Sequence, residues 1–270
     1  MPEPDVAAAV ARLDALTRRL RRDCPWDREQ DERSIVPHTV EEAYELADAA
    51  QSRDDAKLLD ELGDVLFQVH FLSLLLEERG VGDLARVADH CHEKLVRRHP
   101  HVFGDELPEG ATGASTSGEV LRNWDAIKAR EAGRARGLFA DVPETLPAPL
   151  LARKVQRRAA SSGFDFPGVE QALEGVQAEA DAVAEIAGQA GDVRDALFSE
   201  VGDLLFAAVN VARKLRVDPE LALRASSGRF AGRVEAAADL ARAEGAEWAQ
   251  LTPERQLGYY AQVRLGELGG

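Results

Sequence analysis

The sequence predicts an all-α protein, and three observations support that fold class. Apolar residues recur at helical spacing along most of the chain, beginning with Val10, Leu13 and Leu16. No convincing run alternates apolar and polar residues, as a half-buried strand would. Aromatic residues are only 6% of the 270 residues, whereas alanine and leucine are abundant, and this composition favours helix. We therefore expect helices joined by polar connections throughout the chain.

The first half of the chain is predicted to contain five helices. The first begins near Ala7, and Cys24-Pro-Trp-Asp27 is expected to follow it as a loop. Apolar residues surround the central helix almost completely from Val65 to Leu76, so we expect it to be buried centrally or at a subunit interface. Residues 104–118 are rich in Gly, Ser and Thr and are expected to form a mobile loop. The predicted helices are 7–21, 40–50, 54–78, 84–98 and 119–133.

A proline-rich linker divides the sequence into two domains. Residues 141–149 (DVPETLPAP) hold three prolines, a composition typical of a spacer between domains. We expect a first domain at residues 1–137, a linker at 138–149 and a second domain at 150–270. Beyond the linker, the predicted helices are 150–160, 171–189, 192–216, 219–242 and 253–268.

The second domain repeats the first. Glu61-Leu-Gly-Asp64-Val-Leu-Phe67 recurs as Glu200-Val-Gly-Asp203-Leu-Leu-Phe206, and further segments downstream recur in the same order. Several matches in register indicate two tandem copies of one helical domain. A glycine lies inside the repeated helix of both copies, at Gly63 and Gly202, where it costs helix stability. We expect another backbone to approach closely at these glycines.

Charge and composition exclude several classes of protein. Lys and Arg number 33 against 48 Asp and Glu, so a net charge of −15 argues against nucleic acid as the main partner. The sequence shows neither a signal peptide nor an apolar run of roughly 20 residues that could cross a membrane. The two cysteines, Cys24 and Cys91, make no disulfide framework. A cytoplasmic location is therefore expected.

Five carboxylates in the first copy form a candidate metal site. Glu41, Glu42 and Glu45 lie within one helical turn, and Glu61 and Asp64 share a face of the next helix. A short connection makes these helices antiparallel neighbours, so the five side chains can converge. Clustered acids that repel one another are stabilised by hard divalent cations, here Mg²⁺ or its substitute Mn²⁺. The alternative is a solvated acidic face, with Thr39 to Glu42 acting as a capping box.

Basic residues at helical spacing are candidates for binding phosphate. Lys94 and Arg98 are one turn apart, and Lys128 follows Trp124 by the same interval. Cations that complement a polyphosphate would have this pattern, although ordinary surface pairing with the excess acid explains it equally well. Five potential zinc ligands match none of the usual zinc spacings, so we favour a helix-ending turn there. These residues are His90, Cys91, His92, His99 and His101.

The motifs together resemble the MazG family of nucleoside triphosphate pyrophosphohydrolases. They are CPWDREQ (24–30), EEAYE (41–45), ELGD (61–64), KLVRRHPHVF (94–103) and WDAIK (124–128). The resemblance implies two MazG-type bundles of the all-α NTP pyrophosphatase fold and hydrolysis of NTP to NMP and diphosphate. It also implies Mg²⁺ held by Glu41, Glu42, Glu45, Glu61 and Asp64, with Lys94, Arg98, Trp124 and Lys128 near the substrate. By analogy, the resemblance further suggests a homodimer, breadth over NTPs and dNTPs, and a house-cleaning role.

The second copy departs from the MazG pattern. Ala178 and Ala182 stand where the first and last glutamates of EExxE belong, so only Glu179, Glu200 and Asp203 remain. We predict that the first copy is catalytic and the second is mainly a scaffold. Two other functions stay open: a non-catalytic helical dimerisation module that senses nucleotide or divalent metal, and a pyrophosphohydrolase with a narrower substrate range.

Overall fold

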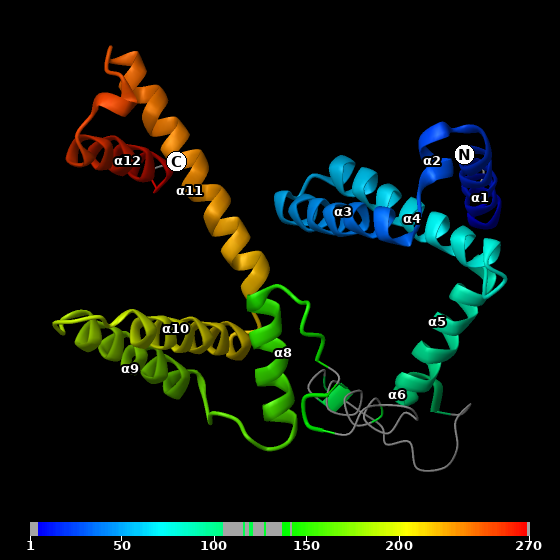
Figure 1. The fold of residues 1–270 in the computed structure, drawn as a ribbon, viewed down its shortest axis with the longest axis horizontal. Coiled ribbons are helices and arrows are strands. Elements are labelled where there is room, and N and C mark those ends of the chain that lie inside the picture. Colours follow the sequence, from blue (N-terminus) through cyan, green and yellow to red (C-terminus); the bar gives the residue numbers. More distant parts are fainter. Residues whose placement is uncertain are drawn as a thin grey trace. The chain divides into compact units, whose positions relative to one another are not determined.

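The computed structural model describes residues 5–104, 116, 119–120, 127, 137–140 and 142–268. The regular elements in these ranges are helices and no strand occurs among them, which confirms the predicted all-α class. The chain divides into two compact units, Met1–Gly133 and Arg134–Gly270 (Figure 1). Within the described ranges, no helix combines the length and the apolar character that crossing a membrane would require.

A helical hairpin forms the body of the first unit. Helices α3 (Glu32–Ser52) and α4 (Asp55–Glu78) lie side by side, and Arg53 turns the chain between them with a φ of 58° (Figure 1). Asp54 caps the start of α4 by accepting hydrogen bonds from the amides of Ala56 and Lys57. The other helices of this unit are α1 (Val6–Asp23), α2 (Pro25–Glu29), α5 (Leu84–Arg98) and α6 (Pro100–Phe103).

The far end of α4 anchors the remainder of the first unit. Ile35, Phe71 and Leu75 form a buried apolar cluster between α3 and α4. Arg18 and Arg21 of α1 each donate two hydrogen bonds to a glutamate at the end of α4, Glu77 and Glu78 respectively. These bidentate pairs fix the orientation of α1 against α4. The apolar cluster and the ion pairs lie at the end of the hairpin away from the turn at Arg53. The end near that turn has neither, and we call it the open end.

Two predicted boundaries in the first unit are wrong. Cys24-Pro-Trp-Asp27 is largely the short helix α2, for which Pro25 supplies a favourable first residue. Helix α3 begins at Glu32 and not at Val40, because Asp31 and Ser34 form the capping box. The predicted cap Thr39 lies inside the helix, where its hydroxyl donates to the carbonyl of Ile35 at 3.3 Å.

Replacing Asp31 by alanine is expected to destabilise the first unit by about 1 kcal/mol, the usual cost of losing an N-cap. The Asp31 carboxylate accepts hydrogen bonds from the amides of Arg33 and Ser34 at 2.8 and 2.9 Å, and the variant leaves both donors to water. Urea unfolding followed by circular dichroism measures the change. The control is Glu29→Ala, at an exposed residue that caps no helix; an equal loss there would contradict the assignment.

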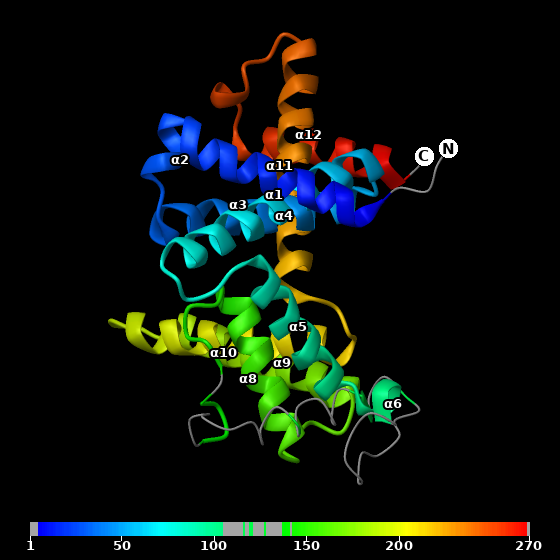
Figure 2. The same cartoon turned by 90° about the vertical axis from the view of Figure 1, so that its right-hand side faces the viewer.

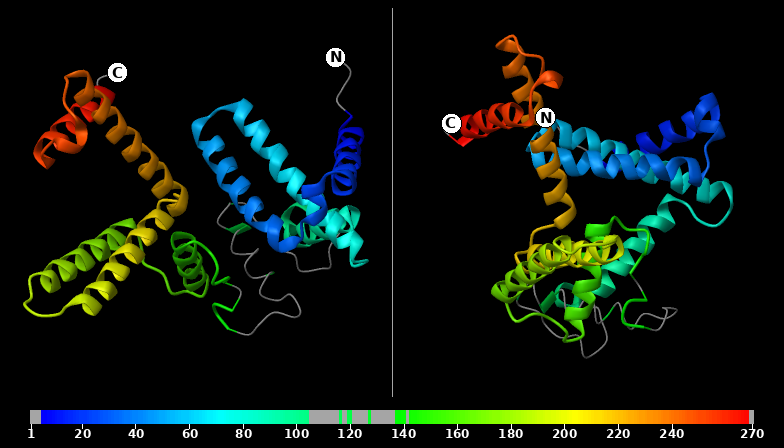
Figure 3. Two further views of the ribbon diagram at one scale, coloured as in Figure 1. Left: turned by 45° about the horizontal axis from the view of Figure 1, so that its top comes forward. Right: turned by 60° about the vertical axis from the view of Figure 1, so that its left-hand side comes forward.

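The second unit repeats the helical hairpin. Helices α9 (Val169–Ala187) and α10 (Arg194–Lys214) lie side by side in both views of Figure 3. Helix α8 (Ala148–Ser161) packs against α10 and also contacts α11 (Pro219–Ala243), as Figure 2 shows from a second direction. The predicted linker therefore ends in the first turn of α8. A second apolar cluster forms around Ala237, Ala241 and Tyr259, where α12 (Pro253–Leu268) and η2 (Trp248–Gln250) meet α11.

Each hairpin leaves an apolar face uncovered within its own unit. Leu59 is 75% exposed on α4 and its counterpart Phe198 is 85% exposed on α10, at matching positions of the repeat. Along α4, burial is concentrated in the second half, where six residues from several sides of the helix are buried and Leu62, Leu66 and Val69 stay exposed; the buried ones are Gln68, His70, Phe71, Ser73, Leu74 and Leu75. The expected close backbone approach at Gly63 and Gly202 is wrong for the described residues, since nothing lies within 4 Å of the space beside either glycine.

Candidate active site

The open end of the α3–α4 hairpin brings three carboxylates together. Oxygens of Glu42, Glu45 and Glu61 all lie within 4.8 Å of one another. Glu42 and Glu45 are one turn apart on α3, and Glu61 faces them from α4 because the hairpin is antiparallel. Glu61 is only 7% exposed, and its Oε2 is buried without a hydrogen-bond partner among the described residues. This site therefore holds buried negative charge that is offset only in part: the charge of Lys57 lowers the pKa of Glu61, yet that pKa stays raised.

Burial and mutual repulsion raise the pKa values of two of these glutamates. The pKa of Glu42 is raised first by desolvation and then by the charges of Asp64, Glu45, Glu61 and Glu41. Desolvation is also the largest cause of the raised pKa of Glu61, with Glu45 as the next contribution. A carboxylate with a raised pKa binds protons and cations more readily than an ordinary one. The cluster is thus prepared to attract a positively charged ligand.

The other two predicted carboxylates lie at the edge of this cluster. Glu41 is 68% exposed along its side chain, and its Oε2 lies 3.1 Å from Nδ1 of His38. Asp64 is exposed one turn after Glu61 on α4, and its charge is the first of the acidic contributions to the raised pKa of Glu42. The charges of both residues help to raise the pKa of Glu42, but the carboxylate of Glu41 lies beside His38.

The donor set fits a hard divalent cation. All candidate ligand atoms are carboxylate oxygens, which suit Mg²⁺, Mn²⁺ or Ca²⁺ better than the thiolates and imidazoles that soft metals select. The unpartnered Oε2 of Glu61 supports this fit, because buried polar atoms without partners are rare in folded proteins. A cation held by Glu42, Glu45 and Glu61 would compensate the buried charge and leave open positions for water or phosphate.

Comparison with known proteins decides the family. Residues 30–103 match the model of the MazG nucleotide pyrophosphohydrolase domain. Over 264 residues the chain is 37% identical to a protein of Escherichia coli K12 named nucleoside triphosphate pyrophosphohydrolase, covering 96% of this chain and 98% of that one. This chain belongs to the MazG family. It is also 36% identical over 245 residues, 90% of each chain, to a nucleoside triphosphate pyrophosphohydrolase/pyrophosphatase MazG of Thermotoga maritima.

The similarity to a third MazG relative covers a smaller part of both chains. A nucleoside triphosphate pyrophosphohydrolase of Mycolicibacterium smegmatis is 34% identical over 188 residues, which are 68% of this chain and 56% of that one. The family model itself covers α3, α4, α5 and α6 with all five predicted carboxylates. The part of this MazG chain that carries the family signature is therefore the part that carries the acidic cluster.

The two predicted phosphate-binding residues of this MazG chain that the structure describes, Lys94 and Arg98, lie on α5 and not on the hairpin that holds the cluster. Both are half-buried on α5. Helix α5 follows the C-terminal end of α4, whereas Glu61 lies toward the N-terminal end of that helix (Figure 1). Trp124 and Lys128 lie outside the described residues. A role of these four residues in binding substrate stays a prediction. Among the histidines and Cys91 of α5 and α6, the described residues form no metal-binding group.

The second unit of this MazG chain keeps part of the cluster. Oxygens of Glu179, Glu200 and Asp203 lie within 4.8 Å of one another across α9 and α10. All three are at least partly exposed, whereas the first cluster contains the buried Glu61. Ala182 stands where Glu45 lies in the first hairpin. The second cluster thus offers fewer acidic neighbours and less burial than the first.

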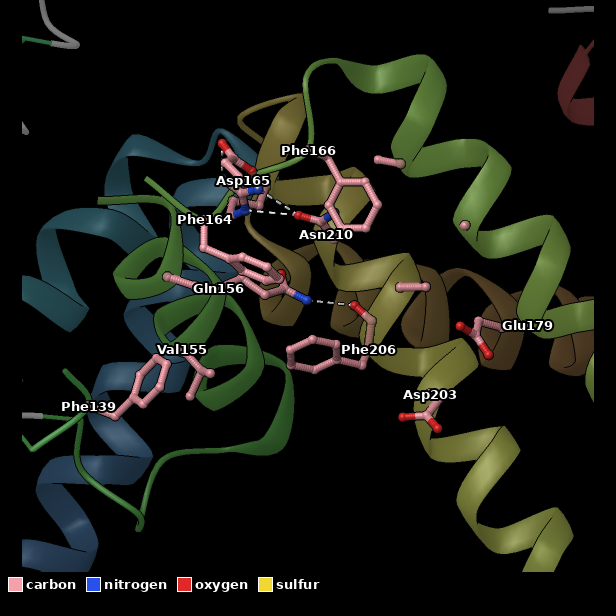
Figure 4. A pocket seen from close by; sticks show the side chains of 15 residues that line it. Phe139, Val155, Gln156, Phe164, Asp165, Phe166, Glu179, Asp203, Phe206 and Asn210 are labelled. Atoms are coloured by element: carbon pink, nitrogen blue, oxygen red, sulfur yellow. Dashed lines mark hydrogen bonds and ion pairs between the residues drawn. The ribbon is translucent and has the colours of Figure 1, made fainter. Parts of the chain in front are cut away.

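Sequence reasoning missed a pocket beside the second cluster. The cavity of about 350 Å³ is lined largely by apolar side chains of α8, α9 and α10 and of the connection between α8 and α9 (Figure 4). The sequence signal was the aromatic segment Phe164-Asp-Phe166, which interrupts an otherwise aromatic-poor chain. Its pairing with Phe206 depends on a tertiary contact between segments about 40 residues apart in the chain, which no local periodicity reveals.

Replacing Glu41 by glutamine is expected to reduce activity less than replacing Glu45 by glutamine. Glu45 contributes an oxygen to the three-carboxylate cluster, whereas Glu41 lies beside His38 and adds only potential. Loss of a ligand removes a direct metal contact, and loss of a nearby charge weakens the site at longer range. Initial rates across a Mg²⁺ titration measure both variants. A Glu41 variant as impaired as the Glu45 variant would show that His38 does not hold Glu41 in the active protein.

Proposed function

We propose that this chain is a Mg²⁺-dependent nucleoside triphosphate pyrophosphohydrolase whose active site is the first acidic cluster. Membership of the MazG family makes it a hydrolase of nucleotide anhydride bonds. The observation that carries the proposal is the convergence of Glu42, Glu45 and the buried, unpartnered Glu61 at the open end of the hairpin. We propose turnover of both NTPs and dNTPs. Glu41 and Asp64 complete the acidic surroundings, and Mn²⁺ is the expected substitute metal.

The reaction requires charge neutralisation and an activated water molecule more than covalent machinery. Water attacks the α-phosphorus, the bond from this phosphorus to the bridging oxygen breaks, and that oxygen leaves with diphosphate. A carboxylate of the cluster that does not hold the cation orients the water and accepts its proton. When bound, a divalent cation supplies the neutralisation that lets phosphate oxygens approach the acids.

A homodimer and a cytoplasmic location complete the proposal. The uncovered apolar residues of α4, among them Leu59, Leu62 and Leu66, favour a partner surface over permanent exposure to water. Both cysteines are unpaired in the structure, as in a reducing compartment. Light scattering during gel filtration tests the assembly, and a Leu62→Asp/Leu66→Asp variant is expected to shift the protein to monomer. A wild-type monomer would remove this part of the proposal.

Product analysis tests the proposed reaction against the sensor alternative. Each common NTP and dNTP is incubated with the full chain and Mg²⁺, and the products are separated by ion-exchange chromatography. NMP with diphosphate is the expected result, and EDTA is expected to abolish it. NDP with phosphate would contradict attack at the α-phosphorus. Binding of nucleotide without turnover under any metal would support the non-catalytic sensor module instead.

A further inference from the structure

His38 contacts an acid of the first hairpin, and the proposed function gives this histidine no role. It lies on α3, one turn before Glu41, and its Nδ1 is 3.1 Å from Oε2 of that residue. An ionised carboxylate can only accept hydrogen bonds, so the ring nitrogen is the donor. Glu41 is therefore held by a specific partner, although its side chain is 68% exposed.

Glu41 lies within reach of the three-carboxylate cluster without belonging to it. It precedes Glu45 by four residues on α3, the interval that puts two side chains on one face of a helix. Its charge also contributes to the raised pKa of Glu42. Yet the oxygens that converge within 4.8 Å of one another are those of Glu42, Glu45 and Glu61. A different rotamer, with the backbone unchanged, would turn the Glu41 carboxylate toward this group.

The ring of His38 packs against a second helix. Its centroid lies 5.8 Å from that of the Trp26 ring on α2, and the two ring planes meet at 62°. Edge-to-face arrangements of this kind are favourable between aromatic rings. The position of the imidazole therefore depends on α2 as well as on the rotamer preferences of α3.

Helix α2 is itself fixed by hydrogen bonds from α1. Arg21 donates from Nη1 to the carbonyls of Asp27 and Gln30, at 2.6 and 2.9 Å. The side chain of Gln30 donates in turn to the carbonyl of Trp26 at 2.9 Å. Because Arg21 also pairs with Glu78 of α4, a continuous set of contacts joins the body of the first unit to the imidazole.

The second hairpin lacks the ring and the carboxylate together. Ala178 corresponds to Glu41, and at the same offset Gly175 corresponds to His38. Glu179, which follows Ala178, is kept and still belongs to an acidic cluster. The copy without the first glutamate of EExxE thus has no ring to hold it. This joint loss links His38 to Glu41 and not to the packing of the hairpin.

We propose that His38 is a positioning residue that withholds Glu41 from the cation of the first cluster. Glu42, Glu45 and Glu61 then hold the cation, and the carboxylate of Glu41 stays on the exposed side of α3. A fourth carboxylate on Mg²⁺ would occupy a position that water or phosphate otherwise takes. The bond from His38 therefore keeps room for substrate beside the cation. The presence of a cation rests on the proposed function, whereas the contacts of His38 do not.

Calorimetric titration of the full chain with Mn²⁺ tests the role of His38 without nucleotide or turnover. The second cluster is silenced by Glu200→Gln/Asp203→Asn, so that the heat reports on the first cluster. His38→Phe keeps a ring against Trp26 and loses the donor. We expect this variant to raise the affinity for Mn²⁺ about two- to fivefold, the range that corresponds to the weak hold of an exposed pair. The thermal midpoint of the metal-free protein is expected to change little.

The same substitution in a Glu41→Gln background separates the proposed role from a direct effect of the imidazole on the cation. There His38→Phe is expected to leave the affinity for Mn²⁺ unchanged, because no carboxylate remains to be released. Three results would overturn the inference: no Mn²⁺ bound at the first cluster, no rise with His38→Phe, or an equal rise in both backgrounds. Failure of the proposed function looks different, because wild-type protein would then release no diphosphate whatever His38→Phe does to Mn²⁺ binding.

Discussion

Replacing Glu61 by glutamine is expected to lower the rate of diphosphate release by at least about 100-fold, since it removes a charged ligand from the metal site. The same substitution at the repeated position, Glu200→Gln, is expected to leave the rate unchanged. Both residues begin the same ExGD segment of their hairpins, and the two variants differ only in the copy that they alter. Rates at saturating Mg²⁺ with ATP and dATP measure the difference.

The thermal stability of the same two variants distinguishes a catalytic role of Glu61 from a structural one. Glu61 is buried with Oε2 unpartnered, and burial and neighbouring acids raise its pKa, so its charge opposes folding in the absence of metal. Glu61→Gln is therefore expected to raise the thermal midpoint of the metal-free protein at neutral pH while activity falls. If Glu61 had only a structural role, the variant would lose activity and thermal stability together.

The pH dependence of that stabilisation has a definite sign. A carboxyl group whose pKa is raised by folding favours the folded state while it is protonated, and this contribution is lost as the pH rises through the raised pKa. The gain in thermal stability from Glu61→Gln should thus grow from acidic toward neutral pH, and Mg²⁺ should reduce it by stabilising the wild type alone.

Loss of turnover in Glu200→Gln with full activity in Glu61→Gln would place catalysis in the second unit.

The sequence was sufficient to predict α4 and the meeting of three of the five acids, for physical reasons. Apolar residues three and four positions apart identify α4 over nearly its full length, because that spacing is the helical repeat. The interval between Glu42 and Glu45 puts both on one face, and a two-residue connection forces Glu61 to face them. Such local rules need no knowledge of distant contacts.

Other features depend on contacts or competitions that local patterns do not express. Asp31 and Thr39 are both good N-cap residues, and the sequence alone does not show that α3 begins at the earlier one and continues through Pro37. Glu41 satisfies the EExxE pattern, yet its carboxylate lies beside His38 on the neighbouring turn. The Gln156 amide meets the carbonyl of Phe206 across α8 and α10, a tertiary contact between segments 50 residues apart.

Restoring glutamates to the second hairpin is expected to create a second active site. In the Glu61→Gln background, Ala178→Glu/Ala182→Glu is expected to raise the rate about 100-fold above that of the parent, since it returns missing charges to three acids that already converge. Ala178 is exposed and Ala182 is half-buried, so both positions have space for a longer side chain. Diphosphate release measures the gain, and Ala178→Gln/Ala182→Gln is the uncharged control.

The first hairpin indicates which of the two substitutions carries the gain. Ala182 corresponds to Glu45, which belongs to the three-carboxylate cluster, whereas Ala178 corresponds to Glu41, which lies beside His38. Ala182→Glu alone should therefore recover most of the activity and Ala178→Glu alone very little. If the double variant folds and binds Mg²⁺ but stays inactive, missing acids are not what separates the two units. The difference would then lie in the cations around the phosphates, since the second hairpin places Ala196 where Lys57 precedes Glu61 by four residues.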